Sequence, residues 1–163
     1  MLDQFVGHRP RVTAYFGLLA VGLSLLAAGI EAARLAVVGP LDPTTFAGYA
    51  AVGLSAGLAV SFLAAYVNGS LVSGWLVGAV PAAGRVGGLT LQGAAVGSAA
   101  AVYGTAGVGF VLGGVSYGLA AEKLRREMVA ADLQAATPRV TSTALALASV
   151  GLGLACLVVV STL

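Results

Sequence analysis

The sequence has few of the residues that carry catalysis or keep a protein soluble in water. Only 9% of its 163 residues are charged, and it contains one histidine, one cysteine and one tryptophan. A soluble globular chain has roughly 25% charged residues. A single cysteine excludes an intramolecular disulfide and a thiolate metal cluster, and the lone His8 precedes the first apolar run without an acid cluster beside it. We therefore expect no enzyme, no metal site and no cofactor.

The few charges also exclude nucleic acid as a partner. The formal net charge of +2 is spread over both ends of the chain and one loop, without a dense lysine and arginine tract. Proteins that bind the phosphate backbone concentrate many positive charges on one surface. The basic residues of this chain are instead typical of those that set the orientation of a membrane protein.

What the sequence does contain is long apolar runs that are rich in glycine. Hydrophobic residues make up 59% of the chain, and its 24 glycines lie mostly inside the apolar runs. Small residues in such positions let membrane helices approach closely. The sequence predicts an all-α, polytopic transmembrane helical bundle, a single integral membrane domain over residues 1–163 in contact with the lipid bilayer.

Turn and cap residues divide the apolar sequence into segments. Gly-Pro at 39–40 ends the first one, and Asp42 followed by Pro43 is the pairing of a helix N-cap with proline at the first helical position. Asn-Gly at 68–69 predicts a tight turn, and "GRVGG" at 84–88 predicts a further break. The predicted spans are residues 12–38, 44–67, 71–84, 89–121 and 140–163, with a cytoplasmic helical extension and loop at 122–139.

The third predicted span is the least regular. Residues 71–84 are few for a span and include Pro81, so the alternative is four spans plus a re-entrant or interfacial segment. The basic residues favour a crossing. Arg9 and Arg11 precede the first span and the other basic group lies at 123–139, and both can be cytoplasmic only if an even number of spans separates them. We predict five spans in the cell membrane, with the N-terminus cytoplasmic and the C-terminus outside.

One charged pair lies within the first apolar run. Counted from Val12 at 1.5 Å per residue, Glu31 lies about 28 Å along a helix, close to the roughly 30 Å thickness of the hydrocarbon core. We interpret Glu31 and Arg34 as an ion pair at the outer membrane boundary, with side chains that reach toward the headgroups. The alternative is a functional pair inside the membrane, because ionisable residues there are usually functional.

Two runs of small residues recur at intervals of four, which places them along one side of a helix. The fourth span has Gly93, Gly97, Ala101, Thr105, Gly109 and Gly113, and the second span has Gly53, Gly57 and Ser61. Such a groove is typical of close helix packing. The partner helix can belong to the same bundle, to a second copy of the chain or to another membrane protein.

These patterns favour a non-enzymatic, small multi-pass membrane protein that acts through helix packing, as an accessory subunit or a self-associating bundle. The alternative function is a small transporter or channel. In that case Glu31, Arg34 and the hydroxyl groups of the fourth span line a path.

Overall fold

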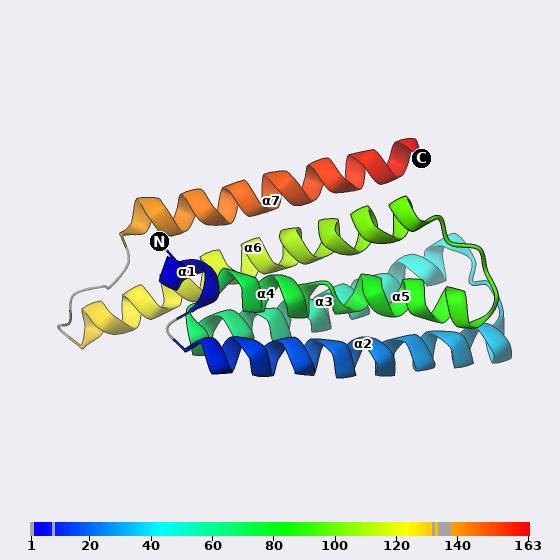
Figure 1. Ribbon diagram of the computed structural model, residues 1–163, viewed down its shortest axis with the longest axis horizontal. Helices are drawn as coiled ribbons and strands as arrows, with labels where there is room; N and C mark the ends of the chain where they lie inside the picture. The colour runs from blue at the N-terminus through cyan, green and yellow to red at the C-terminus, as the bar shows by residue number, and fades with distance from the viewer. Residues whose placement is uncertain (1, 8, 132, 134–137) are drawn as a thin grey trace.

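The computed structural model describes residues 2–7, 9–131, 133 and 138–163, and every regular element in these ranges is an α-helix. A short helix α1 (Leu2–Val6) lies against α4. The rest of the chain runs back and forth along one long axis, and α4 and α5 follow one another end to end (Figure 1). The elements are α2 (Pro10–Val38), α3 (Pro43–Asn68), α4 (Leu71–Gly78), α5 (Val80–Leu91), α6 (Ser98–Ala130) and α7 (Arg139–Thr162).

Helices α2, α3, α6 and α7 are each long and apolar enough to cross a membrane. Their outward side chains are apolar as well: Leu18 of α2 is 75% exposed and Val140 of α7 is 81% exposed. A surface covered with large apolar side chains is unfavourable in water and favourable against lipid tails. The structure therefore supports a multi-pass membrane protein in contact with a bilayer.

The predicted cap between the first two spans is present. Oδ1 of Asp42 accepts hydrogen bonds from the backbone N–H groups of Thr44 and Thr45, at 3.0 and 3.1 Å, and Pro43 begins α3. Hydrogen bonds from the Thr45 hydroxyl and these amides hold the pKa of the Asp42 carboxyl below its usual range, because they favour its charged form. At the other end of α3, Gly69 has a φ of +62°, the left-handed conformation expected for the Asn-Gly turn.

The third predicted span and the start of the fourth are different in the structure. The predicted break at residues 84–88 is wrong, because α5 continues through these residues to Leu91. Gly88 is needed for close approach and not for a turn: a Cβ added there would lie 2.5 Å from Cβ of Glu31 on α2. The chain reverses later, where Gly93 has a φ of +77°, and α6 begins at Ser98 instead of residue 89.

Helix α4 lies at the centre of the bundle and touches the backbone of α6. A Cβ added at Gly74 would lie 3.2 Å from the carbonyl oxygen of Gly113, and one added at Gly78 would lie 3.1 Å from its backbone nitrogen. Only residues without a side chain permit this separation. Helix α7 in turn packs chiefly on the other side of α6, where Gly153 faces Gly107 (Figure 1).

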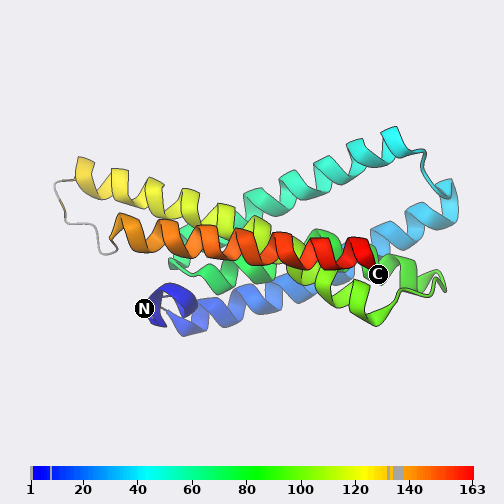
Figure 2. The same cartoon turned by 90° about the horizontal axis from the view of Figure 1, so that it is seen from above.

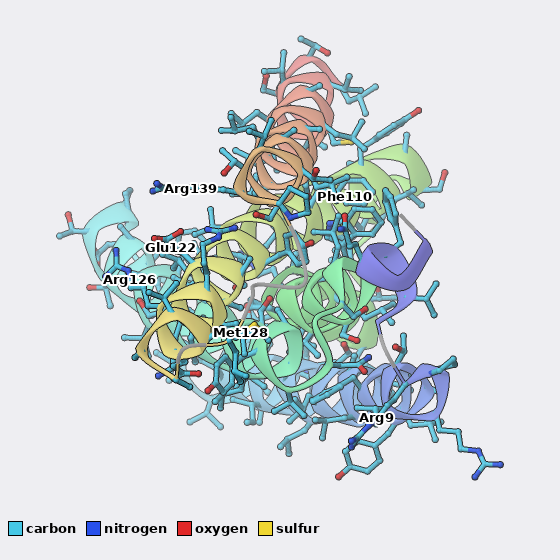
Figure 3. The ribbon with its side chains drawn as sticks, turned by 90° about the vertical axis from the view of Figure 1, so that its left-hand side faces the viewer. Arg9, Phe110, Glu122, Arg126, Met128 and Arg139 are labelled. Atoms are coloured by element: carbon cyan, nitrogen blue, oxygen red, sulfur yellow. The ribbon has the colours of Figure 1, made fainter. Side chains whose placement is uncertain are left out.

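The two basic groups of the sequence lie at the same end of the bundle. Arg9, Arg126 and Arg139 all face the viewer in Figure 3, near the start of α2, the end of α6 and the start of α7. Glu122 forms salt bridges with Arg126 at 3.3 Å and with Arg139 at 3.6 Å. Because α4 and α5 together run along the bundle like the other long helices, the chain returns to the same end and both basic groups lie there.

We expect the contact between α4 and α6 to tolerate no added methyl group. A Cβ at Gly113 would lie 2.6 Å from the backbone nitrogen of Trp75, so Gly113→Ala should destabilise the protein by about 1–3 kcal/mol through overpacking. Gly151→Ala is the matched control, since its Cβ would meet nothing within 4 Å and the change favours the helix slightly. Thermal unfolding in mild detergent measures both, and equal midpoints for the two variants would contradict the contact.

Candidate functional site

Glu31 is a carboxylate buried inside the bundle. Its side chain is 2% exposed, and it lies seven residues, about 10 Å of helix, before the end of α2 at Val38. Its carboxylate points toward α3 and α5, where it contacts Tyr49 and Arg85. The position of the pair at the membrane boundary stays a prediction. A buried charge of this kind is unfavourable unless every acceptor position finds a donor.

Three residues supply those donors. Arg34 binds the carboxylate with two hydrogen bonds, from Nε to Oε2 and from Nη2 to Oε1, each 2.9 Å long. The Tyr49 hydroxyl donates to Oε2 at 2.9 Å, and Nη1 of Arg85 donates to Oε1. Each oxygen of Glu31 therefore accepts two hydrogen bonds, which is about the capacity of a carboxylate. We call Glu31, Arg34, Tyr49 and Arg85 the ion cluster.

The two arginines of the ion cluster differ in what else they hold. Arg34 is 12% exposed and donates a further hydrogen bond to the carbonyl oxygen of Gly39, at 2.8 Å, at the end of its own helix. Arg85 is 36% exposed, and its guanidinium carbon lies 4.7 Å from the centre of the Phe46 ring. Two guanidinium groups face one carboxylate, so the ion cluster carries one excess positive charge.

The ion cluster forms one end of an apolar pocket of about 500 Å³ between α2, α3 and α5. Figure 2 shows the first half of α3 diverging from α6, and this half of α3 supplies Phe46, Tyr49 and Gly53 to the pocket lining. Glu31, Tyr49 and Arg85 are the polar residues among its lining, and the rest is apolar. From Glu31 the pocket extends along α2 to Leu23, about 12 Å at 1.5 Å per residue. Its volume lies within the range of small-molecule sites.

The small residues predicted to form grooves occupy several different environments. Gly109 and Gly113 are buried against α4, Gly57 is buried against Pro81 of α5, and Gly53 lines the pocket. Ser61 is buried as well, and its hydroxyl donates to the carbonyl oxygen of Gly74 at 2.8 Å. Ala101 and Thr105 are half-buried on α6, whereas Gly93 and Gly97 precede this helix and are exposed.

The hydroxyl groups of the fourth span do not join the ion cluster. Val108 is the only residue of α6 that lines the pocket. The pocket therefore does not bring Glu31 and Thr105 together into one path. Polar groups elsewhere tie helices to one another: Nε1 of Trp75 donates to the Ser149 hydroxyl at 2.7 Å, which donates to the carbonyl oxygen of Phe110 at 2.8 Å.

Arg85 and Tyr49 complete the ion cluster, and the sequence analysis assigned neither of them to it. Arg85 is the only charged residue between Asp42 and Glu122, which was a usable signal. The glycines on both sides of Arg85 predict a break there, whereas the structure has helix α5. Within the described residues no group of three or more histidine, cysteine, aspartate or glutamate side chains could hold a metal, and His8 lies outside those residues.

Comparison with known proteins gives no relative from which a role could be transferred. No protein-family model matches the chain, and neither a curated protein nor a solved structure matches it. Any functional inference therefore rests on the ion cluster and the pocket.

We expect Glu31→Gln to destabilise the protein strongly. The change leaves two guanidinium groups without their buried counter-charge, and breaking a buried pair in this way costs about 3–5 kcal/mol. Glu122→Gln is the control, because Glu122 pairs with arginines too but is 30% exposed, and pairs near the surface contribute about 0–1 kcal/mol. Thermal unfolding in detergent compares the two, and equally small losses would show that the ion cluster is not a buried unit.

Proposed function

We propose that the protein is a non-enzymatic multi-pass membrane protein that binds an amphiphilic molecule in the pocket between α2, α3 and α5. The observation that carries the proposal is the joining of an apolar pocket of about 500 Å³ to a charged end. Ligand pockets are commonly apolar with a few polar groups that fix orientation, and this pocket has that division along its length.

The state of Glu31 supports binding over catalysis. Its carboxylate already accepts four hydrogen bonds from Arg34, Tyr49 and Arg85. A general base needs a free acceptor position within reach of the proton that it removes. Glu31 instead fixes the positions of the two arginines. The alternative function, a transport path that includes the α6 hydroxyl groups, has no support from the pocket lining.

In this proposal, helix packing within the bundle shapes the pocket. The sequence analysis left open whether the small-residue grooves pack within the bundle or against another chain. Because Gly57, Gly109 and Gly113 are covered by α4 and α5 of the same chain, those grooves support the internal arrangement that leaves the pocket between α2 and α3. We therefore base the function on the pocket and assign no protein partner.

The proposal includes a membrane orientation. Leu71 to Leu91, through α4 and α5, extends about 30 Å at 1.5 Å per residue, enough to cross the hydrocarbon core. With this segment as a fifth crossing, the basic end that carries Arg9 and Arg139 lies in the cytoplasm and the ion cluster lies toward the outer side.

A reporter fused after Leu163 tests this orientation. The five-crossing arrangement places that position outside, so alkaline phosphatase fused there should be active and a fluorescent protein that folds only in the cytoplasm should stay dark. Fusions in the loop after α6, within residues 131–138, are the control and should give the reverse pattern. A cytoplasmic signal after Leu163 would contradict the crossing by α4 and α5.

Gly53→Leu tests the pocket itself. Gly53 lines the pocket and a Cβ there meets nothing within 4 Å, so a leucine would fill the space without displacing the backbone. We expect the affinity for a pyrene-labelled fatty acid to fall at least tenfold, a change of about 1.4 kcal/mol. Gly48→Leu is the matched control, on the same helix and equally open but outside the pocket lining. Unchanged binding by Gly53→Leu would overturn the proposed function.

A further inference from the structure

We propose that the occupant of the pocket is an anionic phospholipid of the surrounding bilayer, with its phosphate on Arg85 and one acyl chain along α2. This inference rests on the proposed function and specifies its ligand. In this inference Arg85, and not Glu31 or Arg34, determines the selectivity for the headgroup.

The first support is the charge imbalance of the ion cluster. Glu31 contributes one negative charge, and Arg34 and Arg85 contribute two positive charges within hydrogen-bonding distance of it. An uncompensated charge beside apolar side chains is unfavourable, and a nearby anion relieves it. An anionic phospholipid such as phosphatidylglycerol carries one net negative charge, which brings the cluster to neutrality. In phosphatidylcholine the choline cation cancels the charge of the phosphodiester.

The second support is that Arg85 is the more exposed of the two arginines and makes fewer hydrogen bonds within the ion cluster. Arg34 uses Nε and Nη2 for Glu31 and Nη1 for Gly39, and its side chain is 12% exposed. Arg85 contacts Glu31 through Nη1 and is 36% exposed. Guanidinium groups bind phosphate oxygens through two parallel hydrogen bonds, so Arg85 can keep one contact with the cluster and direct another to a headgroup.

The third support is the shape of the space beyond Arg85. The apolar lining continues from the ion cluster past Ala27 to Leu23, about 12 Å along α2, in the direction of the bundle centre. Leu26 and Ile30 line the same pocket and are 61% and 55% exposed, so the pocket is open on its outer side. The first part of one acyl chain can lie along this length, while the rest of that chain and the second chain stay in the bilayer.

The experiment equilibrates the purified full chain with an equimolar mixture of phosphatidylglycerol and phosphatidylcholine and counts retained lipids by native mass spectrometry. We expect the wild type to retain phosphatidylglycerol about tenfold over phosphatidylcholine, the ratio that 1.4 kcal/mol gives. Arg85→Gln should retain lipid without this preference, while Arg85→Lys keeps part of it, because an ammonium preserves the charge but not the paired geometry.

Two controls separate this inference from the proposed function. Arg126→Gln removes a 78% exposed arginine at the opposite end of the bundle and should leave the preference unchanged. Gly53→Leu should lower retention of both lipids. If Gly53→Leu lowers retention but Arg85→Gln keeps the preference, the pocket binds lipid and the role of Arg85 is wrong. Equal retention of both lipids by the wild type would also overturn the inference.

Discussion

The arrangement of the whole bundle depends on the backbone contact between α4 and α6. Gly74 and Gly78 on one helix face Gly109 and Gly113 on the other, where added side-chain atoms would meet backbone at about 3 Å. Contact at this distance lets α4 occupy the centre and touch α2, α3 and α6 together. Without a hydrophobic driving force between helices in lipid, such close van der Waals packing is a main source of association.

The same use of glycine positions the charged site. Gly88 lets α5 pack directly against the side chain of Glu31. Arg85, less than one turn earlier on α5, therefore reaches the carboxylate that Tyr49 of α3 also binds. Burial of Glu31 is tolerable because four hydrogen bonds satisfy it. The ion cluster has an excess positive charge because two of the three residues that donate hydrogen bonds to Glu31 are arginines.

The features that could be predicted from the sequence are those fixed by neighbouring residues. Asp42 with Pro43 and Asn68 with Gly69 determine local backbone geometry, and the structure has the expected cap and turn. The glycines at residues 84–88 predicted a break that the structure does not have, because glycine serves both tight turns and close approach. Only the helix opposite, which carries Ala27 and Glu31, distinguishes the two uses. The pairing of Glu31 with Arg34 is local, whereas its pairing with Arg85 joins residues 54 positions apart and requires the fold.

The self-contained pairing of Glu31 with Arg34 on α2 has a kinetic consequence. Arg34 neutralises the carboxylate through two hydrogen bonds within one helix, so Arg85 can turn away from Glu31 without leaving a bare charge behind. That movement is a rotation about side-chain bonds, a class of motion that takes picoseconds to nanoseconds in exposed residues. The charged end can therefore rearrange with the helices remaining in place.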